Sequence, residues 1–67
     1  MKICKCKGNV VDLFGKVLFR DGDICAATWA GSSWEVYGTE EINGKRYVDA
    51  RDNGRRLSEK MFQNHFE

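Results

Sequence analysis

The sequence has 67 residues, a length that supports one hydrophobic core and therefore one domain over residues 1–67. Eleven Lys and Arg residues against ten Asp and Glu leave a net charge of +1, far from the basic balance of a dedicated nucleic-acid binder. A chain this small needs nearly all of its apolar residues to close the core, which leaves no walls for a deep catalytic cleft, so we expect a non-enzymatic domain.

Location is inferred from apolar runs and from cysteine use. No apolar run approaches the ~20 residues that cross a bilayer, and the first residues, MKICKCKGN, lack the apolar stretch of a signal peptide. Three cysteines cannot all pair within one chain, which favours free thiols in a reducing compartment. We therefore expect a cytoplasmic protein without a membrane partner.

Turn residues recur about every ten positions, which is typical of the short strands of a small barrel or sandwich. They delimit expected strands over residues 2–7, 15–20, 23–30, 34–41, 45–51 and 55–57. Asn43-Gly44 and Asn53-Gly54 each predict a tight two-residue hairpin, because such turns need positive φ at both positions. Both faces of residues 23–30 are mostly apolar or small, as in a strand bent around a small barrel. We predict an all-β fold, a bent antiparallel SH3-like barrel of five to six strands.

The C-terminal residues predict a short helical turn instead of a strand. Ser58 can cap a helix over residues 59–65 by accepting a hydrogen bond from a free amide of the first turn. Met61, Phe62 and Phe66 then form an apolar edge, which we expect to cover the open end of the barrel.

Several motifs resemble small SH3-like proteins encoded by phages and prophages. The matching residues are the stretch FRDGDICAA at 19–27, Tyr47-Val48-Asp49, Asn53-Gly54, and Ser58 with Phe62, His65 and Phe66. The resemblance spans roughly residues 14–67 and implies a phage or prophage accessory protein that binds another macromolecule.

A weaker resemblance links the chain to Tudor domains, which are SH3-like barrels that hold methylated Lys or Arg in an aromatic cage. Residues 22–29, GDICAATW, look like the Tudor opening strand, and the aromatics of residues 34–37 fall near its next aromatic positions. Where a Tudor domain supplies its remaining cage aromatics, this chain has RDNG at 51–54, so part of the cation–π attraction is missing.

Zinc and thiol chemistry are alternatives for Cys4, Cys6, Cys25 and His65. Thiolates and an imidazole suit tetrahedral zinc, but the sequence has no Cys-x2-Cys knuckle, and buried free cysteines behave as small hydrophobes. A catalytic Cys–His pair would need an orienting third group, which the sequence does not offer. We predict structural cysteines, without a metal or cofactor, and zinc stays an open alternative.

The expected binding residues are aromatics and arginines in the second half of the chain. Exposed aromatics beside arginines suit peptide recognition, in which the rings anchor and the charges orient a protein partner. The same groups suit base stacking, so a weak single-strand nucleic-acid binder is the alternative, and a Tudor-type methyl reader is the third. The oligomeric state is left open. The predicted binding residues are Trp29, Trp34, Tyr37, Tyr47, Arg46, Arg51 and Arg55.

Overall fold

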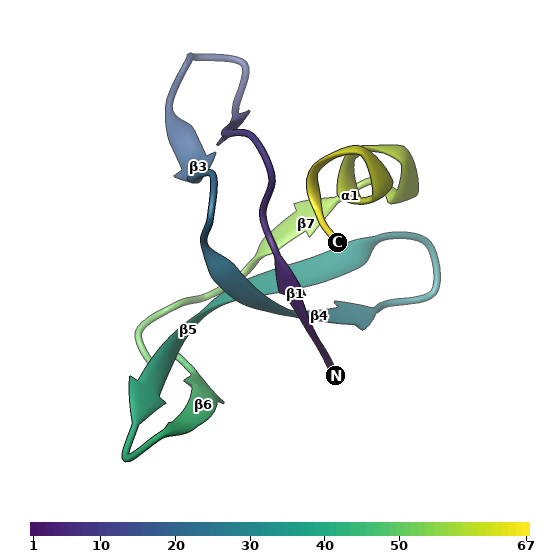
Figure 1. Ribbon diagram of the computed structural model, residues 1–67. Helices are drawn as coiled ribbons and strands as arrows, with labels where there is room; N and C mark the ends of the chain where they lie inside the picture. Colours follow the sequence, from purple (N-terminus) through teal and green to yellow (C-terminus); the bar gives the residue numbers. More distant parts are fainter.

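The computed structural model describes residues 1–67, which form seven β-strands followed by one short α-helix (Figure 1). All strand pairs are antiparallel, which confirms the prediction of a mainly β fold with a helical turn at its C-terminal end. The elements are β1 (Lys2–Lys5), β2 (Val10–Val11), β3 (Val17–Phe19), β4 (Ile24–Trp29), β5 (Trp34–Ile42), β6 (Lys45–Val48), β7 (Arg55–Leu57) and α1 (Glu59–His65). The structure contains no helix with the length and apolar character needed to cross a membrane.

The long strand β5 organises the sheet because its two halves have different partners. Residues 34–38 pair with β4, and residues 34–36 also pair with β7 on the other side. Residues 39–42 pair with β6 and carry the β5–β6 hairpin away from the rest of the sheet (Figure 1). Strand β1 pairs with the free side of β4, and β2 and β3 form a separate two-stranded hairpin.

The predicted barrel is not closed, because β1 and β6, the two ends of the strand order, do not pair. The chain just after β1 instead pairs with the C-terminal residues. Lys5 and Glu67 exchange two backbone hydrogen bonds of 3.0 Å, the Lys7 N–H donates to the His65 carbonyl, and Cys6 bridges Phe66. The end of the chain therefore occupies an edge that a closing strand would otherwise use.

The two Asn-Gly pairs have different outcomes. Asn43 and Gly44 have φ of 51° and 80° and join β5 to β6 in a tight hairpin, as predicted. The hairpin predicted at Asn53-Gly54 is wrong, because β7 pairs with the first half of β5 and not with β6. The side chain of Asp52 explains the difference: it accepts hydrogen bonds from the N–H groups of Gly38 and Gly54 and ties this segment to β5.

The core lies between the sheet, the β2–β3 hairpin and α1. Its aromatic rings form a connected series, in which Phe62 stacks on Trp34 at 4.3 Å between centroids and on Phe66 at 5.1 Å. Phe66 in turn meets Phe19 edge to face at 5.6 Å. The ten buried residues of the core are Cys4, Cys6, Val10, Phe19, Cys25, Ala27, Val36, Leu57, Phe62 and Phe66.

Helix α1 covers this core through two of its three predicted apolar residues. Ser58 caps the helix as predicted, since its Oγ accepts a hydrogen bond of 3.1 Å from the Met61 N–H. Phe62 and Phe66 are buried, whereas the side chain of Met61 lies at the surface. The helix therefore contributes a narrower apolar edge than the sequence indicated.

Candidate functional site

The structure places three of the four predicted aromatics, Trp29, Trp34 and Tyr37, on opposite faces of the sheet. Trp29 and Trp34 are cross-strand neighbours on β4 and β5 with ring centroids 5.4 Å apart. Trp34 packs against the core through Phe62, and Trp29 is 45% exposed at the rim. Because side chains alternate along a strand, Tyr37 lies on the other face of β5 from Trp34. These three rings therefore do not form one binding surface.

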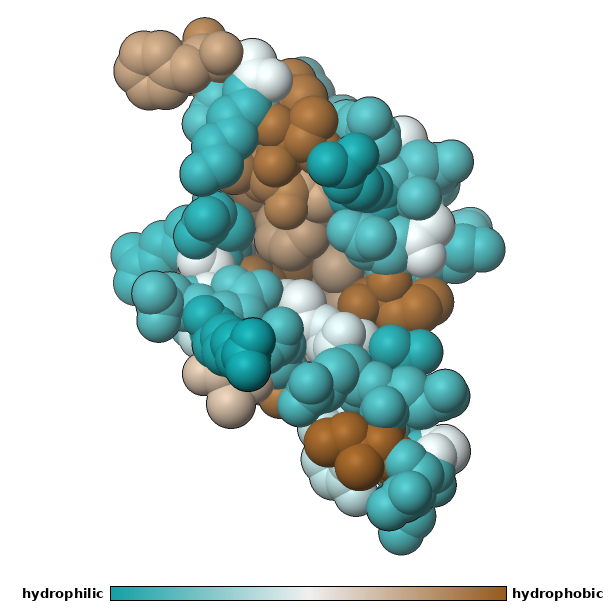
Figure 2. Space-filling model, turned by 90° about the vertical axis from the view of Figure 1, so that its left-hand side faces the viewer, coloured by the Kyte–Doolittle hydropathy of each residue, from teal (hydrophilic) through white to brown (hydrophobic).

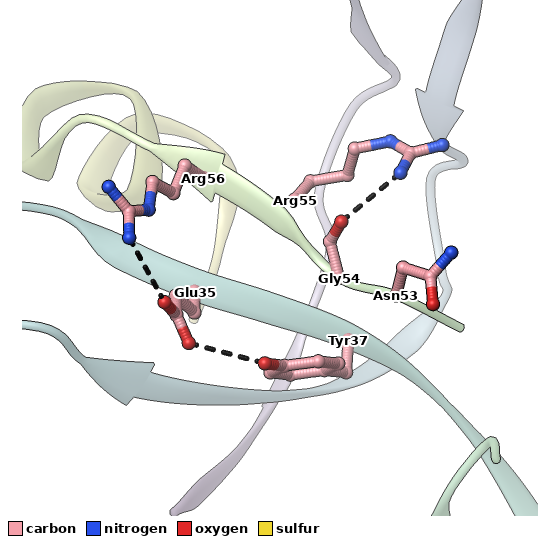
Figure 3. A pocket seen from close by; sticks show the side chains of 6 residues that line it. All are labelled: Glu35, Tyr37, Asn53, Gly54, Arg55 and Arg56. Atoms are coloured by element: carbon pink, nitrogen blue, oxygen red, sulfur yellow. Dashed lines mark hydrogen bonds and ion pairs between the residues drawn. The ribbon is translucent and has the colours of Figure 1, made fainter. Parts of the chain in front are cut away.

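The remaining predicted residues are distributed over the second half of the chain. Arg46 and Tyr47 lie on β6 in the projecting β5–β6 hairpin, where Glu41 and Glu40 stand opposite them. Arg51 is exposed in the loop after β6. Arg55 and Tyr37 line the same small pocket, but the side chain of Arg55 extends away from the Tyr37 ring (Figure 3).

Arg46 also lines a second hollow of about 370 Å³ between the start of β4 and the β5–β6 hairpin. Two hydrogen bonds involve residues that line this hollow. The carboxylate of Asp23 accepts the Arg20 N–H at 2.9 Å, and the Thr39 hydroxyl donates to the Ile24 carbonyl at 2.6 Å. The Arg46 side chain forms no hydrogen bond within the chain.

The small pocket beside Tyr37, called the Tyr37 pocket below, has a volume of about 230 Å³ (Figure 3). Glu35 is its central contact: one carboxylate oxygen accepts the Tyr37 hydroxyl at 3.2 Å, and the other lies 3.6 Å from Arg56. This hydrogen bond and the negative charge of Glu35 raise the pKa of Tyr37. The lining residues are Glu35, Tyr37, Asn53, Gly54, Arg55 and Arg56.

The wall of the Tyr37 pocket depends on a glycine. The ring of Tyr37 lies so close to Gly54 that a Cβ on Gly54 would be 2.6 Å from the nearest ring carbon. Gly54 also has φ of +79°, which side-chain-bearing residues rarely adopt. Asp52 fixes the segment by accepting the N–H groups of Gly38 and Gly54, so the pocket is formed before any ligand arrives.

The β2–β3 hairpin presents a feature that the sequence reasoning missed. At its end, Leu13 is fully exposed and Phe14 is 93% exposed. Figure 2 shows hydrophobic side chains projecting at the top of the molecule, where the hairpin projects in Figure 1. We call residues 12–16 the hairpin tip.

The hairpin tip is an ordered turn and not a loose loop. The carboxylate of Asp12 accepts the N–H groups of Phe14 and Lys16 at 2.8 and 2.9 Å. Backbone hydrogen bonds from Asp12 to Lys16 and from Gly15 to Asp12 close the same turn. The sequence signal was the Asp-x-x-Gly pattern, because an Asp side chain often bonds the backbone two residues on and Gly supplies the positive φ.

The three cysteines are free and buried in the core. Their thiols donate to backbone carbonyls, Cys4 to Cys25, Cys6 to Gly8 and Cys25 to Asp23. Burial, followed by nearby negative groups, raises the pKa of Cys25 to about 12, so almost no thiolate is present at neutral pH. No three His, Cys, Asp or Glu side chains come together in an arrangement that could hold a metal ion.

Comparisons with known proteins add no assignment to this geometry. No protein-family model, no curated protein and no solved structure matches the chain.

Proposed function

We propose that this chain is a non-enzymatic module that binds a protein partner and inserts its hairpin tip into an apolar pocket of that partner. The observation that carries the proposal is the exposure of Leu13 and Phe14 side by side on a hydrogen-bonded turn. Isolated exposed apolar residues are common, but a fixed pair at a projecting end, one of them aromatic, suits the apolar centre of a protein interface.

The tip gains affinity in two ways when it is buried. Burying a Leu or Phe side chain is worth about 1.5–3 kcal/mol each, so the pair offers about 3–6 kcal/mol. Because Asp12 already holds the turn through two side-chain hydrogen bonds, little backbone freedom is lost on binding. A protruding pair needs a concave partner, and a protein pocket provides one.

Charge favours a protein over a nucleic acid or an anionic membrane. Proteins bind nucleic acids and anionic membranes mainly through clustered Lys and Arg. The hairpin tip carries one Asp and one Lys, which balance, and the whole chain has a net charge of only +1. The separation of Tyr37 from Trp29 and Trp34 also leaves a stacking platform or a Tudor-type cage without its set of neighbouring rings.

The finer fold and the biological setting belong to the same proposal. The bent β5, shared between two groups of strands, and the C-terminal residues beside β1 support an SH3-like arrangement. The resemblance over residues 14–67 supports an accessory role in a phage or prophage.

The test compares the wild type with the double variant Leu13→Ser/Phe14→Ser. We expect a specific protein to be retained from a lysate of the source cell after nuclease treatment, and its purified form to bind the double variant at least about 100-fold more weakly. Ile42→Ser is the matched control, because it removes a half-exposed apolar side chain from the tip of the other hairpin. Equal affinity for the wild type and the double variant would remove the tip from the interface.

Two further experiments show whether the chain binds a membrane or a nucleic acid instead. Lipid vesicles that bind the wild type but not the double variant would assign the tip to a membrane surface. Retention that disappears with nuclease would assign the chain to a nucleic acid. Either result contradicts the proposal.

A further inference from the structure

We infer that strand β6 pairs with β6 of a second copy of this chain, so that two β5–β6 hairpins join in one antiparallel ribbon. Strand β6 ends the strand order of the sheet, and all of its residues are exposed. The β5–β6 hairpin also projects from the rest of the molecule (Figure 1). An exposed edge of unpaired N–H and C=O groups is a template for pairing with another strand.

The backbone groups that face outward belong to Arg46 and Val48. In an antiparallel pair, alternate residues of a strand bond to the same neighbour. The Asp49 N–H donates to the Gly38 carbonyl at 3.0 Å, and the pairing continues in register to the two-residue turn, so residues 45, 47 and 49 bond to β5. The N–H and C=O groups of Arg46 and Val48 therefore point away from β5, where no strand of the chain accepts them.

A two-fold axis at Tyr47 gives a pairing that suits the side chains as well as the backbone. Arg46 of each copy then exchanges backbone hydrogen bonds with Val48 of the other copy. The two Tyr47 rings lie opposite each other, and Lys45 of each copy lies opposite Asp49 of the other. Side chains approach most closely in such non-hydrogen-bonded pairs, and aromatic or opposite-charge pairs there stabilise a sheet.

The side chains that this pairing uses are available in the single copy. Tyr47 is 49% exposed, and Lys45 is exposed and forms no ion pair within the chain. Asp49 Oδ1 accepts the Arg51 N–H at 2.9 Å, and the other carboxylate oxygen has no hydrogen bond within the chain. The pairing therefore breaks no contact that the chain already makes.

Like charges reject the neighbouring registers of this edge. A two-fold axis at Arg46 would place the two Arg46 side chains opposite each other, and an axis at Val48 would place Lys45 opposite Arg51 of the other copy. Like charges directly opposite destabilise a sheet. The charges of the edge thus select the register with its axis at Tyr47.

The other open edge, on β1, does not suit a second copy. Lys5 exchanges its backbone hydrogen bonds with Glu67, which leaves only the outward groups of Met1 and Ile3 free. Pairing Met1 with Ile3 of another copy would place the two Lys2 side chains opposite each other. A pairing of short strands lies below the ~1,200 Å² of stable interfaces, so we expect a reversible dimer through β6.

Dilution of the full chain, followed by nuclear magnetic resonance, tests the pairing without any other protein. The chain is diluted from about 1 mM to about 10 µM, and amide shifts and hydrogen exchange are followed by residue. We expect concentration-dependent shifts centred on residues 44–50. The Arg46 and Val48 amides should exchange more slowly at the high concentration, because only the dimer bonds them, whereas the Tyr47 amide is bonded to β5 in both states.

Charge reversal tests the register. Lys45→Glu and Asp49→Lys should each weaken association by about tenfold or more, because each places like charges opposite on both sides of the axis. An equal mixture of these two variants should associate again, since Glu then faces Lys on one side and Asp faces Lys on the other. Lys60→Glu is the matched control, because it makes the same change of charge at an exposed position of α1, and it should leave association unchanged.

The amide spectrum of each variant shows whether it is folded. Asp49→Lys loses the acceptor of the Arg51 N–H, so Asp49→Asn, which keeps an acceptor and loses the charge, is measured beside it. It should weaken association by about threefold.

Four results would overturn the inference: a chain that is monomeric at about 1 mM, association that the charge variants leave unchanged, no association in the mixture of two folded variants, or assemblies larger than a dimer. Concentration-dependent shifts at residues 12–16 in place of 44–50 would also overturn it, by assigning self-association to the hairpin tip. Because only this chain is present, failure here leaves the hairpin-tip proposal standing, and failure of the tip variants leaves this result standing.

Discussion

Replacing Gly54 by alanine tests how the Tyr37 pocket is built. The new Cβ would lie 2.6, 2.9 and 3.0 Å from three atoms of the Tyr37 ring, so the ring or the backbone has to move. If the ring moves, it loses the 3.2 Å hydrogen bond to Glu35. Alanine would also have to keep φ near +79°, in the region that glycine tolerates best.

The two penalties can be estimated separately. The left-handed backbone costs a residue with a side chain about 1–2 kcal/mol. Loss of the Tyr37–Glu35 hydrogen bond, which lies at the surface, adds about 1 kcal/mol, and the displaced ring contacts add about 1 kcal/mol more. The sum is about 3–4 kcal/mol, against a total stability of about 3–10 kcal/mol for a chain of this length.

Urea unfolding followed by tryptophan fluorescence measures this cost. Gly44→Ala is the matched control, because Gly44 has φ of +80° but a Cβ added there would meet nothing within 4 Å. Gly44→Ala should lower the free energy of unfolding only by the cost of the left-handed backbone, about 1–2 kcal/mol. In a Tyr37→Ala background, Gly54→Ala should cost no more than Gly44→Ala does. Equal losses for Gly54→Ala and Gly44→Ala in the wild-type background would refute the ring contact.

Three further expectations concern the core and its helix. The pKa of Cys25 is raised from 9.0 to about 12, so only the unfolded thiol ionises between these values. The free energy of unfolding should fall by up to about 1.4 kcal/mol per pH unit above pH 9. In urea titrations, Cys25→Ala should make this fall shallower. A free energy of unfolding that does not change with pH in this range would contradict the burial of Cys25. Ser58→Ala should lower the free energy of unfolding by about 1 kcal/mol and reduce the helical circular dichroism signal, because it removes the cap on the Met61 N–H. An unchanged midpoint of urea unfolding would show that the cap does not stabilise the fold. Phe62→Ala should lower the free energy of unfolding by about 3–5 kcal/mol, and Trp29→Ala should lower it clearly less, because Phe62 is 4% exposed and Trp29 is 45% exposed. If thermal melts showed Trp29→Ala to be the more destabilising change, the assignment of the core would be wrong.

Local signals in the sequence were sufficient for most of the secondary structure. The strands follow the turn residues because Gly and Asn supply the positive φ that a change of chain direction needs, as at Asn43-Gly44. The cap at Ser58 is equally local, since it depends on a hydroxyl three residues before an amide.

Non-local contacts explain what the sequence could not show. The same dipeptide at Asn53-Gly54 makes no hairpin, because Asp52 ties that segment to Gly38, fourteen positions earlier in the chain. Glu35 contacts Arg56 because β7 pairs with β5, and no local sequence pattern predicts this strand pairing. Barrel closure likewise depends on long-range pairing, and here the C-terminal residues pair beside β1.

The candidate site was only partly predictable for a similar reason. Tyr37 and Arg55 were expected and line the same pocket, but alternation places Trp34 on the other face of β5 and the side chain of Arg55 extends away from the Tyr37 ring. Leu13 and Phe14 were not among the predicted binding residues, because a sequence does not show which apolar side chains the core leaves uncovered. Their exposure follows from the projection of a two-stranded hairpin beyond the core.

The decisive test of the hairpin-tip proposal is the affinity of an identified, purified partner for the wild type and for Leu13→Ser/Phe14→Ser, with stability measured in parallel. Because both side chains are exposed, the double variant should keep its free energy of unfolding within about 0.5 kcal/mol. We predict at least about 100-fold weaker binding by this stably folded variant. Unchanged affinity would contradict the proposal.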